Sequence, residues 1–215
     1  GSAGKTGTKD ALALVLGRQG KTGATTGNLN NHWGLPLSLA RLPRDATYGL
    51  FELGMSAPGE SAPLSEIARP DVAIITTVES AHLEFFESED GIADAKAEIF
   101  AGMKRDGVAV LNRDNRHYQR LRRHAEHAGL SRILSFGAHD EADFRLTGLD
   151  LQNINCTVSA QLQGRDVTYM LGAPGRHWAL NSLAVLAAVT ALGADTDSAM
   201  QALADVTPAK GRGER

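Results

Sequence analysis

Residues 71–77, Asp71-Val72-Ala73-Ile74-Ile75-Thr76-Thr77, say most about the fold. This run has no polar alternation and is rich in β-branched residues, which is typical of a strand buried on both faces of a parallel sheet. Shorter apolar runs at residues 48–53, 107–111 and 132–136 predict three further strands of the same kind.

Helical patterns separate these strands. Apolar residues recur at helical spacing in residues 5–16, 35–42, 92–103 and 116–128. Alternating strands and helices imply right-handed crossovers and a mostly parallel sheet that carries helices on both faces. The sequence therefore predicts a three-layer α/β domain, with loops at the polar or proline-containing residues 23–31 and 57–63.

The rhythm changes after Phe136. Three short strands are expected in direct succession, at residues 144–150, 155–162 and 165–171, with a tight turn at Gln163-Gly164. We expect these strands to form a small antiparallel appendage. Helices at 175–192 and 197–204 follow, and 207–215 has the composition of a linker, so we predict one domain over 1–206 and a linker over 207–215.

Composition excludes several classes of protein. The 215 residues carry a net charge of −3, so no basic surface for nucleic acid or membranes is indicated. The one cysteine, Cys156, can form neither an intrachain disulfide nor a four-cysteine zinc site. No apolar run reaches the roughly 20 residues of a membrane span. A cytoplasmic protein is the expectation.

The chain opens with Gly1-Ser2-Ala3-Gly4-Lys5-Thr6, which matches the second half of a phosphate-binding P-loop. Glycines there let backbone N–H groups face phosphates, Lys5 would reach the β- and γ-phosphates, and the Thr6 hydroxyl would bind Mg²⁺. The alternative is an ordinary glycine-rich helix start. No strand precedes Gly1, so we expect a fragment that lacks its first strand and binds nucleotide poorly on its own.

Two polar residues follow predicted strands. Glu52 ends one strand and His82 comes shortly after the next, so both should lie at the carboxyl edge of the sheet, where ligands bind in open α/β folds. A carboxylate and an imidazole at this edge indicate a metal site. The alternatives are a surface glutamate and a structural or exposed histidine.

Other candidates depend on weaker signals. Asn28, Asn30 and Asn31 crowd one loop, which suggests polar contacts to a ligand but also suits a loop that needs left-handed backbone. His177 and Asn181 are four residues apart on one helix and share a face, so they could contact a base or a ribose, or could instead be a solvent-facing capping pair.

Together these motifs resemble the Mur ligases, and most closely the MurF group within that family. The matching segments run through the whole chain in the family's order: Gly4-Lys5-Thr6, Gly27–Asn31 with Gly34-Leu35-Pro36, Glu52-Leu53-Gly54, Pro58-Gly59-Glu60, Ala81-His82-Leu83-Glu84, Ala95–Phe100, Leu111–Asn115, Pro174–His177 with Asn181, and Gly211-Arg212.

The resemblance implies the central ATP-binding domain of a three-domain ligase, monomeric and inactive as a fragment. Such enzymes join D-Ala-D-Ala to UDP-N-acetylmuramoyl-tripeptide through an acyl phosphate, in the peptidoglycan synthesis that underlies cell wall, cell shape and division. A MurE-like ligase, a folylpolyglutamate synthase and a non-catalytic nucleotide-binding module remain alternatives.

The resemblance also implies roles for individual residues. Lys5 would stabilise the transferred phosphoryl group, Thr6 and Glu52 would bind one Mg²⁺, and His82 with a carbamylated Lys96 would help to bind a second. On its own sequence, Lys96 is a solvated helix lysine. The remaining positions resemble the adenine side and the hinge of the family: Asn112, His177 and Asn181 for adenine, and Arg212 for the hinge. Ala97 and Trp178 depart from the usual Gly and Asn.

Overall fold

The structure is a computed structural model that describes residues 1–27, 29–79, 86 and 88–208. Its α-helices are α1 (Lys5–Gly17), α2 (Gly34–Ala40), α3 (Ser61–Ala68), α4 (Glu89–Ala97), α5 (Tyr118–His127), α6 (Arg176–Ala191) and α7 (Thr196–Ala202), with 3₁₀ helices η2 (Glu98–Gly102) and η3 (Leu203–Asp205). Its strands are β1 (Thr22–Ala24), β2 (Tyr48–Leu50), β3 (Val72–Ile75), β4 (Val108–Asn112), β5 (Arg132–Gly137), β6 (Phe144–Leu151), β7 (Cys156–Leu162) and β8 (Arg165–Leu171).

Six strands form one sheet in the order β3-β4-β5-β6-β7-β8. The pairs from β3 to β6 are parallel, with Val72 opposite Val108 and Val108 opposite Arg132. The pairs β6–β7 and β7–β8 are antiparallel. β1 and β2 form a separate parallel pair. The predicted α/β class, with a mostly parallel sheet and helices, is confirmed.

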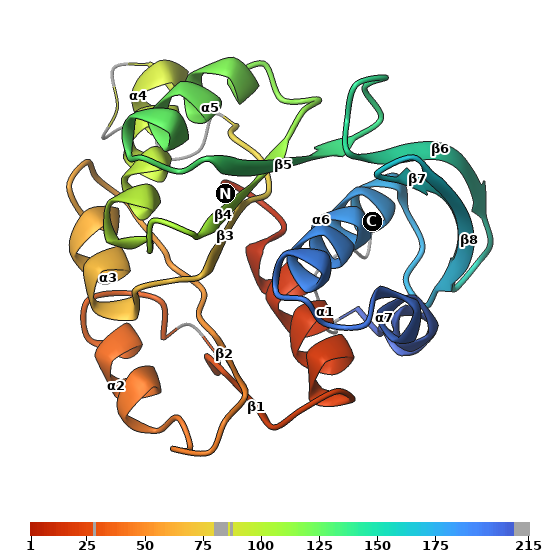
Figure 1. The fold of residues 1–215 in the computed structure, drawn as a ribbon, viewed down its shortest axis with the longest axis horizontal. Helices are drawn as coiled ribbons and strands as arrows, with labels where there is room; N and C mark the ends of the chain where they lie inside the picture. Colours follow the sequence, from red (N-terminus) through yellow and green to blue (C-terminus); the bar gives the residue numbers. More distant parts are fainter. Residues whose placement is uncertain (28, 80–85, 87, 209–215) are drawn as a thin grey trace.

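The central strand β4 shows how the layers arise. Val108 and Val110 belong to the apolar cluster that contains α1 and α6, whereas Ala109 and Leu111 belong to the cluster that contains α4 and α5. Successive side chains of a strand point to opposite faces, so β4 is buried on both. The sheet therefore separates α1 and α6 from α4 and α5 (Figure 1), as three layers require. No helix in the described ranges is both long enough and apolar enough to cross a bilayer.

The three late strands are not a separate appendage. β6 pairs with β5 in parallel, Phe136 opposite Phe144, so β6–β8 continue the main sheet and curve around α6 (Figure 1). The expected antiparallel strands are present, and β6 joins them to the parallel part of the sheet. The turn at Gln163-Gly164 is confirmed: both residues have positive φ, as a two-residue hairpin turn requires.

Two expected loops contain regular structure. Residues 22–24 form β1, because β2 supplies a parallel partner from more than twenty residues away in the chain. Residues 61–68 form α3, whose start is held by the Glu98 carboxylate: Glu98 accepts hydrogen bonds from the backbone N–H groups of Gly59 and Ser61, at 2.7 and 3.1 Å. The division into 1–206 and 207–215 stays a prediction, since residues 209–215 lie outside the described part.

Candidate functional site

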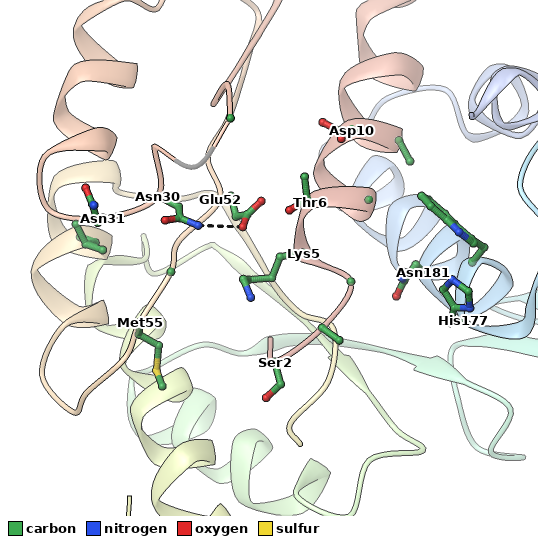
Figure 2. A pocket seen from close by; sticks show the side chains of 18 of the residues that line it. Ser2, Lys5, Thr6, Asp10, Asn30, Asn31, Glu52, Met55, His177 and Asn181 are labelled. Carbon is green, nitrogen blue, oxygen red and sulfur yellow. Dashed lines mark hydrogen bonds between the residues drawn. The ribbon is translucent and has the colours of Figure 1, made fainter. Parts of the chain in front are cut away.

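A cavity of about 1120 Å³ opens beside the first turn of α1. Its walls come from distant parts of the chain: residues 2–7, the loop after β1, the segment after β2, the first turn of α6, and residues 205–207. Figure 2 shows Lys5 and Thr6 in the middle, Asn30 and Glu52 to their left, and His177 and Asn181 to their right. The structure brings the phosphate loop, Glu52 and the start of α6 together around this cavity.

The phosphate loop is fastened to the end of β3. The Ser2 N–H donates to the Thr77 carbonyl at 2.7 Å, and the Thr76 hydroxyl donates to the Ala3 carbonyl at 2.5 Å. Gly4 then has φ of +81°, a left-handed conformation that favours glycine, and α1 begins at the next residue. Gly4, at the N-cap position, has no side chain that could cap this helix start. Its backbone N–H groups and its dipole therefore make the cavity favourable for anions.

Lys5 brings a positive charge to the same place. Its side chain is half-buried, lines the cavity, and donates from Nζ to the Gly1 carbonyl at 2.7 Å. Thr6 lines the cavity one residue further along α1. A phosphate group bound here would meet both the ammonium and the helix terminus, which is the arrangement that the sequence predicts.

Glu52 has an incomplete set of partners. It is only 8% exposed. Its Oε1 accepts a hydrogen bond from Asn30 Nδ2 at 3.1 Å, whereas its Oε2 has no hydrogen-bond partner among the described residues. A buried carboxylate oxygen without a partner is costly. A cation would remove this cost, so the donor set of Glu52 and the Thr6 hydroxyl fits Mg²⁺, which favours oxygen ligands.

Protein groups alone do not complete such a site. Within the described ranges, no group of three or more His, Cys, Asp and Glu side chains could hold a metal ion. Mg²⁺ commonly keeps several waters and takes one or two carboxylates plus substrate phosphates. The geometry therefore suits a cation that arrives with a nucleotide.

Lys96 is buried, not solvated as its local sequence alone suggests. It is 8% exposed and lines a second cavity, of about 460 Å³, that lies between β2 and β3 and shares Ser2, Lys5 and Glu52 with the first. Burial, together with the positive charge of Lys5, lowers the pKa of Lys96 to about 8. Each of these causes disfavours the charged amine.

The asparagines of the loop after β1 have different roles. Asn28 lies outside the described residues. Asn30 and Asn31 both line the cavity, but Asn31 Oδ1 accepts hydrogen bonds from the N–H groups of Trp33 and Gly34 and so shapes the start of α2. Asn30 instead contacts Glu52. Contact of these residues with substrate stays a prediction.

The start of α6 forms another wall. His177 is exposed and lines the cavity together with Trp178 and Asn181. Asn181 contacts the phosphate loop so closely that a Cβ at Gly4 would lie 2.8 Å from its Nδ2. Trp178 packs equally tightly against α1, because a Cβ at Gly7 would lie 2.7 Å from its Cη2.

Asn112 is not one of the described residues that line the cavity. Its Nδ2 donates to the Thr76 carbonyl at 2.9 Å, and its Oδ1 accepts from the Asp114 N–H at 2.9 Å. The side chain therefore ties the ends of β3 and β4 together in this structure. His82 and Arg212, the other two predicted site residues, lie outside the described residues.

The sequence profile of the Mur ligase middle domain matches residues 1–189. The chain belongs to the Mur ligase family. It is 34% identical to the UDP-N-acetylmuramoyl-tripeptide–D-alanyl-D-alanine ligase of Rickettsia prowazekii, covering 100% of this chain and 48% of the relative. The ligase of the same name from Escherichia coli is also 34% identical, with 99% and 46% covered.

Solved structures agree with this membership. MurF from Acinetobacter baumannii superposes with a TM-score of 0.92 at 32% identity, covering 98% of this chain and 46% of that one. MurF from Thermotoga maritima in complex with ADP has a TM-score of 0.87 at 31% identity, with 98% and 48% covered. The Mur ligase chain described here spans about half the length of the curated relatives it matches.

Two glutamates of this Mur ligase were missed as site residues. Glu60 lines the cavity and its Oε2 accepts from the Ser56 N–H at 2.6 Å, which shapes the segment after Glu52. Glu98 holds the start of α3 from a position 39 residues after Gly59. Both residues lie in segments that match the family, Glu60 in Pro58-Gly59-Glu60 and Glu98 in Ala95–Phe100. The contact of Glu98 left no local signal, because its partners are far away in the chain.

Proposed function

We propose that this chain is the ATP-binding domain, over residues 1–206, of a ligase that joins D-Ala-D-Ala to UDP-N-acetylmuramoyl-tripeptide in peptidoglycan precursor synthesis. One observation carries the proposal: an uncapped helix start with Lys5 and Thr6 faces, across one cavity, a buried carboxylate with an unpartnered oxygen. The activity named for the relatives, and the ADP in the Thermotoga maritima structure, support it.

The proposed reaction has two steps. A carboxylate oxygen of the tripeptide attacks the γ-phosphorus of ATP and ADP leaves, which forms an acyl phosphate. The amine nitrogen of D-Ala-D-Ala then attacks the acyl carbon, phosphate leaves, and the nitrogen loses a proton. Lys5 and the N–H groups at the start of α1 stabilise the negative charge on the transferred phosphoryl group. In phosphoryl transfer, such electrostatic stabilisation by preorganised donors is usually the largest contribution to catalysis.

Two cations are part of the proposal. Thr6 and Glu52 would hold one Mg²⁺, and His82 with a carbamylated Lys96 would help to hold the other. When bound, these ions supply positive charge that offsets the triphosphate and the incoming carboxylate. The unpartnered Oε2 of Glu52 supports the first assignment.

Carbamylation of Lys96 has chemical support in its surroundings. Its amine must be neutral to attack the carbon of CO₂, and a proton is released as the carbamate forms. With a pKa of about 8, roughly one amine in ten is neutral at pH 7, far more than for an ordinary lysine. A carbamate resonance in ¹³C NMR under labelled bicarbonate, lost in Lys96→Arg, tests this assignment.

The start of α6 is proposed as the adenine side. His177 and Asn181 line the cavity beyond the phosphate loop, and Trp178 lies between them in the sequence. Asn112, which the family likeness also assigns to adenine, would have to give up its bonds to the ends of β3 and β4 to reach the base. Arg212 would lead through the linker to a further domain, and the ligase would act as a monomer.

Nucleotide binding by the full-length protein that contains these residues tests the proposal most directly. Lys5→Ala should weaken ATP affinity about tenfold to a hundredfold, because hydrogen bonds to charged groups contribute about 1.5–3 kcal/mol. Isothermal titration calorimetry measures this. Lys21→Ala is the matched control, since Lys21 is exposed and pairs with Asp45. Equal ATP affinity in Lys5→Ala and the unaltered chain would refute the phosphate-loop assignment.

Ligation itself requires the full-length protein that contains these residues. Product formation is then compared for D-Ala-D-Ala and for single amino acids as acceptors. Exclusive use of a single amino acid would exclude the proposed acceptor, and nucleotide binding without any acyl phosphate would indicate a non-catalytic module.

A further inference from the structure

The two carboxylate oxygens of Glu52 have different surroundings. Oε1 accepts a hydrogen bond from the Asn30 amide at 3.1 Å (Figure 2), and Oε2 is buried without a hydrogen-bond partner among the described residues. We propose that Asn30 is a specificity-determining residue that reserves Oε1, so that Glu52 offers a cation one oxygen and the site favours Mg²⁺ over Ca²⁺. This inference depends on the proposed nucleotide–cation function of the cavity.

Asn30 is held firmly enough for this role. Its backbone carbonyl accepts a hydrogen bond from the Gly54 N–H at 2.7 Å, which ties the loop after β1 to the segment after β2. Its side-chain amide packs directly on Gly54, where an added Cβ would lie 2.9 Å from Oδ1 and 3.1 Å from Nδ2. The amide is therefore confined between Gly54 on one side and Glu52 on the other.

The neighbouring asparagine shows that this contact is not a general property of the loop. Asn31 Oδ1 accepts hydrogen bonds from two backbone N–H groups, Trp33 and Gly34, and so serves the local turn. Asn30 Nδ2 donates to a carboxylate 22 residues away. The amide nitrogen at position 30 is thus directed at Glu52, whereas the hydrogen bond from Gly54 is accepted by the main-chain carbonyl of Asn30.

The coordination preferences of the two ions give this contact its consequence. Mg²⁺ is small, demands near-ideal octahedral geometry and keeps several waters, whereas Ca²⁺ takes six to eight oxygens and readily accepts both oxygens of one carboxylate. An N–H donor on Oε1 competes with a cation for that oxygen. Because the amide is neutral, it does so while leaving the negative charge of Glu52 in place.

The test measures how each ion enhances ADP binding, and it requires no turnover. ADP affinity of the full-length protein that contains these residues is followed by calorimetry over a series of MgCl₂ or CaCl₂ concentrations. The ratio of the half-effective Ca²⁺ to the half-effective Mg²⁺ concentration is the readout. We expect Asn30→Ala to lower this ratio about tenfold, the effect of removing one hydrogen bond to a charged group.

Two further variants separate the proposed role from general damage. Gly54→Ala leaves Asn30 in the sequence but displaces its amide, so the ratio should fall in the same direction. Asn153→Ala is the matched control, because Asn153 is exposed in the β6–β7 connection, and its ratio should equal that of the unaltered chain. If Asn30→Ala does not fold, as judged by thermal unfolding, Asn30→Ser and Gly54→Ala carry the test.

The outcomes distinguish a failure of the Asn30 role from a failure of the proposed function. Metal-stimulated ADP binding with an unchanged ratio in folded Asn30→Ala would overturn the role of Asn30 and leave the proposed function intact. Absence of metal-stimulated ADP binding by the unaltered chain would overturn the proposed function and this inference together.

Discussion

At the β6–β8 end of the sheet, large apolar side chains are packed in the core, whereas the phosphate-loop edge buries two ionisable side chains, Glu52 and Lys96. Phe136 and Phe144 are fully buried, and the Tyr169 and Ser182 hydroxyls are hydrogen-bonded at 2.6 Å. Around the cavity, Glu52 has an unpartnered oxygen and Lys96 is a buried amine with a lowered pKa. The first region contributes stability, and the second carries groups that suit a ligand at the expense of stability.

The largest effect is expected in the packed region. Phe144→Ala removes a buried ring from β6, the strand between β5 and β7, and should lower the free energy of unfolding by about 3–5 kcal/mol. Urea unfolding measures the loss. At a temperature where the variant is folded, ADP affinity should be unchanged. A loss well below this range would mean that the β6–β8 end is not the stabilising region that its packing indicates.

Removing the buried amine of Lys96 should raise the free energy of unfolding instead of lowering it. In the folded chain the pKa of Lys96 is about 8, below the ordinary 10.5, so between these values the unfolded chain binds more protons and stability rises with pH. Lys96→Met should therefore stabilise the chain by up to about 3.4 kcal/mol below pH 8, at 1.36 kcal/mol per pKa unit. The gain should vanish as the pH approaches 10.5.

Unfolding at several pH values checks this gain. Lys21→Met, which replaces an exposed lysine, should show no such pH dependence. A stability loss in Lys96→Met at pH 7 would mean that a partner compensates the buried ammonium. The phosphate-loop edge would then not carry the cost in stability that distinguishes it from the β6–β8 end.

Glu52→Gln separates stability from binding. The substitution removes a buried charge whose Oε2 has no partner, so stability should change by less than about 1 kcal/mol or rise. The enhancement of ADP binding by Mg²⁺ should be lost, as calorimetry with and without MgCl₂ would show. Glu66→Gln, at an exposed position of α3, is the control. Retained enhancement would exclude Glu52 as a cation ligand.

The smallest effect is expected on the outer surface between α4 and α5. A hydrogen bond from Arg120, helped by His124, lowers the pKa of Asp94, so this carboxylate stabilises the fold at neutral pH and stops doing so as the pH falls below its ordinary value of 3.8. Because the pair is partly exposed, Asp94→Asn should cost at most about 1 kcal/mol at pH 7. The difference between variant and parent should shrink in acid, and a constant difference would point to lost packing instead.

Local patterns predicted most of the secondary structure of this Mur ligase. The run at 71–77 and the apolar spacing of α1 and α6 depend on neighbours in the chain, and the structure confirms them. β1 and α3 could not be predicted in this way. Three residues become a strand at 22–24 because β2 pairs with them, and α3 begins where Glu98, from a later helix, holds its first backbone N–H groups.

In the candidate site, too, some features could be predicted from local sequence and others could not. Lys5, Thr6 and Glu52 could be selected from the sequence, because a glycine-rich helix start and a strand-end carboxylate have recognisable local signatures and the ends of parallel strands meet at one edge. Pairing and desolvation depend instead on groups that are distant in sequence. The bond from Asn30 to Glu52, the unpartnered Oε2 and the burial of Lys96 therefore emerged only once the chain was folded.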